Sequence, residues 1–259
     1  MPTFLETVVE RIRADLPERI RRVPASDLEA RIHADRRGRP FSEALIREGI
    51  SLIAEMKRAS PSRGPIRPGA GVTEIVRAYQ DAGARACSVL TEPEYFGGSL
   101  DDLAEARAAC ELPLLRKDFL VDEYQLLEAR AAGADAVLLI VAALEQGRLS
   151  ALIHAASELA MDALVEVHDE EEVRRAVDAG AEVIGVNNRD LHSLEVDLET
   201  TYRLLEDIPA GTVVVAESGI TTREHVRELE RAGVDAILVG EALMRVDDPR
   251  DAIRGLLYD

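Results

Sequence analysis

The chain has 259 residues, of which 47% are hydrophobic and 31% charged, so it can bury a sizeable core and has no compositional sign of disorder. Its formal net charge of −18 argues against nucleic acids and anionic membranes as partners, because both are bound through clustered Lys and Arg. The longest apolar run, 136–144, is too short to cross a bilayer, and the acidic N-terminal segment differs from a signal peptide. We therefore expect a cytoplasmic protein without membrane contact, whose two cysteines are reduced.

Residues 1–50 precede the first predicted strand and have a helical pattern, so they are expected to pack as an extension on the rest of the molecule. From residue 51 onward, short apolar strands alternate with helices that have charged outer faces. Strands are predicted at 51–56, 113–116, 163–167 and 213–217, and at the ends of the phrases 81–90, 131–140, 178–186 and 231–240. Helices are predicted at 73–82, 100–110, 123–132, 145–160, 170–179, 198–207, 223–232 and 249–257.

Similar phrases such as DAGARACSVL and AAGADAVLLI recur along the chain, and each joins the end of a helix to a strand. A glycine follows the helical part of each phrase, where a left-handed cap is needed; these are Gly83, Gly133, Gly180 and Gly233. The repeat therefore predicts βα units in regular succession.

Eight βα units, in a chain close to the roughly 250 residues typical of the fold, predict an α/β protein with a (βα)₈ TIM barrel of the phosphate-binding type. We expect a single domain over 1–259, in which 1–50 is the helical extension and 51–259 the barrel. An open, doubly wound sheet is the alternative, and the even repeat disfavours it.

Lysine is the rarest charged residue in the chain and occurs only at Lys57 and Lys117, although Lys and Arg together number 31. Both lysines fall at the ends of predicted strands, where barrel enzymes have their active sites. Arginine stays protonated, whereas the pKa of a lysine can be lowered until it donates and accepts protons. The two lysines are therefore predicted to be catalytic.

Other predicted strand ends carry carboxylates and an amide. Glu55 lies two residues before Lys57 and so shares its side of the strand, because side chains alternate. Glu166, Asn187 and Glu217 fall at or just after the fifth, sixth and seventh strands. Structural barrel layers prefer Val, Ile and Leu, so these polar positions indicate an active centre.

The last two units predict a phosphate site. Ser218 and Gly219 follow the seventh strand, and Gly240 follows the eighth, each just before a helix. Loops at these two places form the recurrent phosphate site of this fold, and their small residues allow close approach. The sequence has no Walker loop, no GxGxxG after a strand, no HExxH and no GxSxG, so nucleotide cofactors, zinc and serine-hydrolase chemistry lack their usual motifs, and no metal site is expected.

The segments AEMKRASPSRG, TEPEYFGGS, LLRKDFLVDEYQ, LVEVHDEEE, IGVNNRDL, VAESGI and LVGEALMR occur in the order of indole-3-glycerol phosphate synthases, and the chain resembles that family over essentially all eight units. The resemblance implies ring closure, decarboxylation and dehydration of 1-(2-carboxyphenylamino)-1-deoxyribulose 5-phosphate to indole-3-glycerol phosphate, in tryptophan biosynthesis and without a cofactor.

By the same resemblance, Lys117 is a general acid toward the substrate ketone and Lys57 holds the carboxylate. Glu166 and one of the lysines then exchange protons during dehydration, while Glu55 and Asn187 position these groups. The resemblance leaves open which lysine serves which step.

The resemblance also implies a substrate-binding set, with an apolar pocket for the anthranilate ring and a cradle for the phosphate. The pocket comprises Phe96, Phe119 and Leu138, the cradle comprises Ser60, Ser218, Gly219, Gly240 and Glu241, and Arg189, Leu191 and Glu217 complete the set. The chain departs from some members at Ala59, where a further lysine can stand, so phosphate affinity or loop closure can differ.

Two alternatives remain open at this point. Another phosphate-binding barrel enzyme, such as phosphoribosylanthranilate isomerase, needs a cysteine and an aspartate at strand ends, whereas Cys87 falls inside the second strand. A noncatalytic metabolite-binding barrel would tolerate arginine in place of both lysines.

His168 and His192 fall near strand ends and are expected on the surface or behind the catalytic groups. The charged helix faces favour a monomer.

Overall fold

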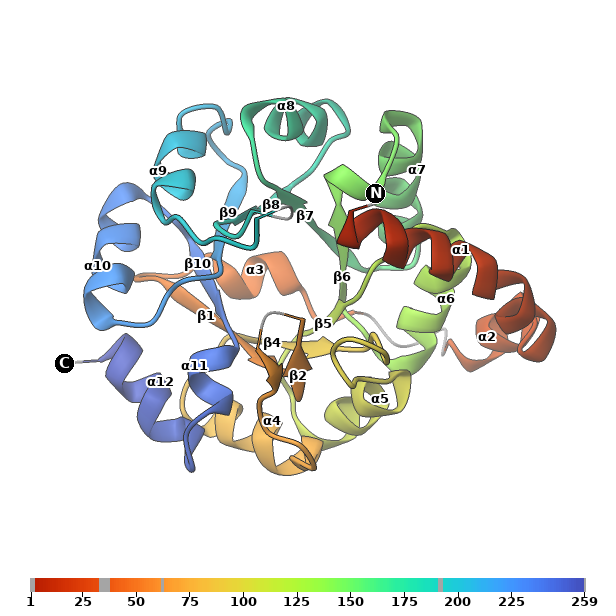
Figure 1. Ribbon diagram of the computed structural model, residues 1–259, viewed down its shortest axis with the longest axis horizontal. Helices are drawn as coiled ribbons and strands as arrows, with labels where there is room; N and C mark the ends of the chain where they lie inside the picture. The colour runs from red at the N-terminus through yellow and green to blue at the C-terminus, as the bar shows by residue number, and fades with distance from the viewer. Residues whose placement is uncertain (1–2, 33–37, 62, 191–192, 259) are drawn as a thin grey trace.

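The computed structural model describes residues 3–32, 38–61, 63–190 and 193–258. Within them, eight parallel strands close into a barrel, each paired with the next barrel strand along the chain, and the last pairs with the first (Figure 1). The barrel strands are β1 (Ser51–Met56), β4 (Ala86–Leu90), β5 (Leu114–Lys117), β6 (Ala136–Ile140), β7 (Asp162–Val167), β8 (Val183–Asn187), β9 (Val213–Glu217) and β10 (Ala236–Val239). The predicted (βα)₈ barrel is confirmed.

Helices surround the barrel and cover the outer faces of its strands (Figure 1). They are α4 (Val72–Asp81), α5 (Leu100–Ala109), α6 (Glu123–Ala132), α7 (Gln146–Glu158), α8 (Glu170–Asp178), α9 (Glu199–Leu205), α10 (Arg223–Ala232) and α12 (Pro249–Leu257). Short helices lie in two of the connections, η1 (Val141–Ala143) after β6 and α11 (Glu241–Met244) after β10. Helix α7 ends before the predicted residue 160, because Ala160 has a positive φ of 52°.

The barrel strands are buried on both faces, which explains why they read as continuous apolar runs. Val, Ile, Leu and Ala fill most of their positions. Helices α6 and α10 each end at a glycine in the left-handed region, Gly133 at φ 100° and Gly233 at φ 93°, as the repeated phrases predict. The turn after each glycine directs the chain into the next strand.

The N-terminal extension forms three helices, α1 (Phe4–Arg22), α2 (Ala25–Arg31) and α3 (Phe41–Leu45). Helix α1 begins with a capping box between Thr3 and Glu6, and it buries one face that includes Leu5, Val8 and Ile12. In Figure 1, α1 and α2 lie beside α6 and α7 on the flank of the barrel.

The third helix of the extension, α3, covers the opposite end of the barrel, where the strands begin. Ser42 donates its backbone N–H to the carboxylate of Asp162, the first residue of β7 (2.8 Å). Ser51, the first residue of β1, donates its hydroxyl to the backbone oxygen of Leu45 (2.8 Å). The extension therefore contacts the molecule at more than one place, and its first residues reach the opposite, carboxyl end of the barrel, as shown below.

After β1, the chain forms a small hairpin of β2 (Ala59–Ser60) and β3 (Gly64–Pro65) beside the carboxyl end of the barrel. Arg58 anchors the base of this hairpin through two hydrogen bonds to the carboxylate of Asp102, each 2.8 Å long. The hairpin after β1 and the loop after β10 both follow the carboxyl ends of their strands, so they lie at the same end of the barrel.

None of the helices in the described residues is both long enough and apolar enough to span a bilayer.

Candidate active site

A cavity of about 640 Å³ lies at the carboxyl ends of the strands. Of the predicted catalytic residues, it is lined by Glu55, Lys57, Lys117, Glu166 and Asn187. Of the predicted substrate-binding residues, it is lined by Ser60, Phe96, Phe119, Leu138, Arg189, Glu217, Ser218, Gly219, Gly240 and Glu241. Leu191 was also predicted to bind substrate and lies outside the described residues. The structure thus brings every described member of the predicted set into one cavity.

Lys117 is the cation at the centre of this cavity. Its Nζ lies 2.9 Å from Oε2 of Glu166 and 3.0 Å from Oε2 of Glu217. These side chains come from β5, β7 and β9, so the lysine spans the mouth of the barrel between two strands that are not its neighbours. Strand β5 includes Lys117, whereas the sequence predicted its end one residue earlier.

Lys57 forms a second ion pair in the cavity. It directly follows β1, and its Nζ lies 2.7 Å from Oε1 of Glu55, two residues earlier. The prediction that the two side chains share one side of the strand is confirmed. The two lysines of the cavity therefore lie beside the buried carboxylates of Glu55, Glu166 and Glu217.

The surroundings of Lys117 keep it protonated. Burial opposes the charged form, but the carboxylates of Glu166, Glu217 and Glu55 raise the pKa of Lys117 above its ordinary value. The expectation of a lowered pKa is therefore wrong for Lys117, because the sequence does not show how many carboxylates surround it. In the unliganded protein, Lys117 therefore carries a positive charge.

The two carboxylates beside Lys117 differ in their proton affinity. Burial favours the neutral acid in both. The charge of Lys117 and the contact with His168 lower the pKa of Glu166 below its usual range. Burial raises the pKa of Glu217 to about 7, with the charge of Glu166 adding to the effect and that of Lys117 opposing it. Near neutral pH, Glu166 is therefore ionised while Glu217 can take up or release a proton.

Two glycines make room for the carboxylates. A Cβ atom on Gly240 would lie 2.4 Å from Oε1 of Glu55, and one on Gly185 would lie 2.3 Å from Oε1 of Glu217. Real atoms do not approach so closely, so any larger residue would displace the carboxylate. Gly240 was predicted as part of a phosphate cradle, and the structure adds that it also sets the place of Glu55.

We expect Gly240→Ala to lower kcat/KM by about 10- to 100-fold, because displacement of Glu55 breaks its ion pair with Lys57 and misplaces the reacting groups. Steady-state kinetics on the purified variant measures the effect. Gly147→Ala is the matched control, since a Cβ atom at Gly147 meets no atom within 4 Å and its φ is ordinary. A Gly240→Ala variant as active as Gly147→Ala would contradict the prediction.

Aromatic side chains form one wall of the cavity. The rings of Phe96 and Phe119 lie 6.3 Å apart, and Phe4 of α1 packs against Phe119 at 6.2 Å. The loop that carries Phe96 is held by the buried carboxylate of Glu92, which accepts hydrogen bonds from the backbone N–H groups of three following residues, Glu94, Tyr95 and Phe96. The wall is therefore preorganised for a flat apolar group.

The opposite side of the cavity is formed by the loops after β9 and β10. Ser218 has a positive φ of 63° and Gly219 one of 81°, so the chain turns sharply there. The side-chain amide of Asn188 supports this turn, because it donates to the backbone oxygens of Glu217 (2.9 Å) and Ser218 (3.2 Å). Helix α10 begins at Arg223, after its cap Thr222, which is the start predicted from the sequence.

Several cavity residues were missed by the sequence analysis. Phe4 and Leu5 come from the extension, Arg63 from the β2–β3 hairpin and Arg245 from the end of α11. Arg63 and Arg245 both pair with the carboxylate of Glu241, at 3.4 Å and 3.0 Å. The chain holds many similar arginines, so only their place in the fold distinguishes these two.

His168 contacts Glu166, whereas the sequence suggested only that it lies on the surface or behind the catalytic groups. The motif LVEVHD, in which the histidine comes two residues after Glu166, was the signal that could have indicated this contact.

Cys87, the thiol that an isomerase-like mechanism would need, lies in β4 and is fully buried. Burial raises the pKa of the Cys87 thiol well above its ordinary value, so it is unreactive. Within the described residues, no group of three or more His, Cys, Asp and Glu side chains is arranged to hold a metal ion.

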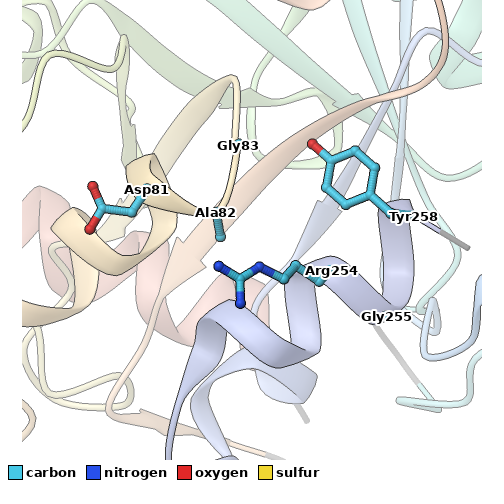
Figure 2. A pocket seen from close by; sticks show the side chains of 6 residues that line it. All are labelled: Asp81, Ala82, Gly83, Arg254, Gly255 and Tyr258. Atoms are coloured by element: carbon cyan, nitrogen blue, oxygen red, sulfur yellow. The ribbon is translucent and has the colours of Figure 1, made fainter.

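A second cavity, of about 530 Å³, lies between the end of α4 and α12 (Figure 2). Its lining consists of Asp81, Ala82, Gly83, Arg254, Gly255 and Tyr258. The ring of Tyr258 faces Gly83, where a Cβ atom would lie 2.8 Å from the tyrosine hydroxyl (Figure 2). None of these residues lines the cavity at the barrel mouth, and only two of them are charged, so the convergent polar groups of an active site lie elsewhere.

The lysines and carboxylates gather at the carboxyl ends of the strands, where (βα)₈-barrel enzymes have their active sites, so fold and cavity together are those of a (βα)₈-barrel enzyme. The family model for indole-3-glycerol phosphate synthase matches residues 5–256. The chain belongs to this family, as its motifs indicated.

Similar proteins agree with this assignment. The chain is 57% identical to indole-3-glycerol phosphate synthase 2 of Streptomyces coelicolor over 219 residues, which cover 85% of each chain. It is 49% identical to indole-3-glycerol phosphate synthase of Mycolicibacterium vanbaalenii, over 98% of this chain and 94% of the relative.

Solved structures resemble the fold at low sequence identity. A tryptophan synthase alpha-subunit from Pyrococcus furiosus is 17% identical with a TM-score of 0.62, covering 80% of this chain and 97% of that one. A thiamine phosphate pyrophosphorylase from the same organism is 22% identical with a TM-score of 0.61, covering 80% and 93%. These likenesses support the barrel alone.

Proposed function

We propose that this chain catalyses ring closure of 1-(2-carboxyphenylamino)-1-deoxyribulose 5-phosphate to indole-3-glycerol phosphate, with loss of carbon dioxide and water. Lys117 carries the proposal, because a protonated lysine held between two carboxylates in a cavity suits a reaction that develops negative charge on oxygen. The aromatic wall suits the anthranilate ring, and the opposite loops suit the phosphate.

In the first step, the anilino ring carbon attacks the ketone carbon and the carbonyl oxygen gains negative charge. Lys117 stabilises this oxygen and donates a proton to it as the alkoxide forms, since its raised pKa keeps it protonated until a strong base appears. Lys57 binds the substrate carboxylate. The carboxylate then leaves as carbon dioxide, and the bonding electrons remain in the new ring system.

In the second step, the hydroxyl formed from the ketone leaves as water and the ring carbon nearby loses a proton. Glu166 is the group that accepts a proton, because it is ionised and lies within 2.9 Å of Lys117, which supplies one. Asn187 donates to Glu166 from 3.2 Å and so limits its orientation, and Glu55 does the same for Lys57. Glu217, with a pKa of about 7, is placed to exchange protons with Lys117 between steps.

The phosphate is assigned to the loops after β9 and β10. Ser218, Gly219 and Gly240 offer a hydroxyl and open backbone, which is the usual phosphate site of this fold. Arg63 and Arg245 place two positive charges beside Glu241 at the same edge. They can compensate for Ala59, where some family members have a lysine.

We also retain the expectation of a cytoplasmic monomer, given the charged helix faces and buried free cysteines.

Turnover of the carboxyphenylamino substrate tests the proposed function. We expect the fluorescence of indole-3-glycerol phosphate to appear with purified protein and added substrate only, and to require the phosphate group of the substrate. The assay is run at low and high salt, because a chain with a net charge of −18 can need counterions to reach full activity. A folded protein that yields no product at either salt concentration would refute the proposal.

A further inference from the structure

His168 contacts a proposed catalytic carboxylate and has no part in the steps described above. It directly follows β7, the strand that carries Glu166. Its Nε2 lies 3.3 Å from Oε1 of Glu166, the oxygen to which Asn187 donates. Lys117 contacts the other oxygen, Oε2. Each oxygen of Glu166 therefore faces a positively charged or hydrogen-bond-donating side chain, and His168 is one of these side chains.

Glu172 of α8 holds the imidazole ring in place. Its Oε2 lies 3.0 Å from Nδ1 of His168 and accepts a hydrogen bond from the backbone N–H of the same residue at 2.8 Å. Glu172 lies in the first turn of α8, and its own N–H donates to the capping carboxylate of Asp169 (2.8 Å). The ring thus lies between two carboxylates, and both of its nitrogens are expected to carry protons.

The charges around this pair come from several elements. Glu166 faces Lys117 from β5, and Lys117 in turn faces Glu217 from β9 and Glu55 from β1. His168 faces only the carboxylates of Glu166 and Glu172 among the described residues. Its side chain is 12% exposed, so water screens these charges weakly. Removal of His168 would leave Lys117 as the sole cation beside Glu166 in the described part of the site.

We propose that His168, held by Glu172, is a positioning residue that fixes the orientation and the negative charge of Glu166 for proton transfer. The inference rests on the proposed function, in which Glu166 accepts a proton during dehydration. Burial opposes the charged ring, but the two carboxylates raise the pKa of His168 to about 10. The ring is therefore cationic at neutral pH, as the geometry requires.

The first test needs no substrate. In protein labelled with ¹⁵N at histidine, the ring signals of His168 are those that disappear in His168→Gln. We expect them to titrate well above pH 7 in the wild-type chain. The midpoint is expected to fall by about 2 pH units in Glu172→Gln and in Glu166→Gln, since each removes one carboxylate. A wild-type midpoint near the ordinary value of about 6.5 would overturn the proposal.

The second test uses kinetics and two substitutions of different reach. Glutamine can place its amide nitrogen near the position of Nε2, beside Glu166, whereas asparagine reaches only the position of Nδ1. We expect kcat to fall by about tenfold in His168→Gln and by about 100-fold in His168→Asn. In both, the acid limb of the kcat/KM profile is expected to move about 1 pH unit upward, because Glu166 loses a positive neighbour and its pKa rises.

His154→Gln is the matched control. His154 pairs with Glu158 four residues later in α7, the same spacing as His168 and Glu172, but both side chains are exposed and neither lines the cavity. We expect this variant to keep the wild-type kcat and pH profile. Circular dichroism shows whether each variant is folded.

The outcomes separate this inference from the proposed function. Failure of the wild-type chain to turn over the substrate refutes the function, while the titration of His168 still decides whether the ring is held as a cation between its carboxylates. With an active wild type, a lower kcat in His168→Asn at an unchanged pH profile would overturn the proposal, since a merely structural role predicts that result. A His168→Asn variant with wild-type kcat would overturn it as well.

Discussion

Replacement of Lys117 by methionine is expected to lower kcat by about 10²- to 10⁴-fold while the barrel stays folded. Methionine has a similar length and no charge, so the variant removes the proton donor and the cation between Glu166 and Glu217. The site can tolerate the loss structurally, because Glu217 has a pKa of about 7 and can take up a proton to relieve the repulsion. Steady-state kinetics and circular dichroism measure the two effects.

Two comparisons sharpen this result. Lys117→Arg keeps a positive charge, but its larger planar guanidinium cannot take the place of the compact ammonium between Glu166 and Glu217, so we expect it to be almost as inactive as Lys117→Met. Lys57→Met removes a cation that we assign to substrate binding, so its main effect is expected on KM. Retention of more than a tenth of the wild-type kcat in Lys117→Met would show that another group protonates the substrate.

Substitution of Arg116 by methionine is expected to lower the free energy of unfolding by about 3–5 kcal/mol. Arg116 lies in β5 with 1% of its side chain exposed, next to Lys117 in sequence. It donates to the carboxylate of Asp118 (2.9 Å), the hydroxyl of Thr91 (3.1 Å) and the backbone oxygen of Gln125 (2.7 Å). Methionine fills the space but leaves these buried acceptors without their donor.

Urea denaturation of the wild-type chain and of Arg116→Met measures the difference in their free energies of unfolding. The matched control is Arg203→Met, since Arg203 pairs with Glu170 at 2.9 Å while both side chains are about half exposed. We expect that change to cost about 0–1 kcal/mol, as for other exposed ion pairs. Equal effects of the two substitutions would show that the network around Arg116 adds no more than a surface pair does.

The barrel could be predicted because its signals are local. In each repeated phrase, the glycine that follows the helix has the left-handed backbone conformation predicted for it, as at Gly133. The strand after it is a run of apolar residues, as expected for a strand buried on both faces. The two lysines were identified by rarity and by their strand-end positions. The fold then brings all strand ends to one mouth, so residues far apart in sequence, such as Lys117 and Glu217, could be grouped before any contact was known.

The features of the site that could not be predicted depend on how many side chains surround a residue in the fold and on where those side chains point. The pKa of Lys117 was expected to fall, but three carboxylates point at it and raise it. Phe4 reaches the cavity only because α1 begins at the barrel mouth, and no periodicity within α1 shows where the helix begins relative to the barrel. His168 looked peripheral because its role depends on Glu172, a residue that the sequence presents as an ordinary member of an acidic first helical turn.

The scarcity of lysine has a practical consequence for labelling. Reagents that acylate amines, such as succinimidyl esters, find two side chains in this chain besides any α-amino group, and both line the same cavity. Coupling a dye or a solid support through lysine would therefore modify the active centre, whereas arginine-rich surfaces would stay untouched. Because Lys117 is held protonated, its amine is expected to react slowly, and bound product would shield both lysines.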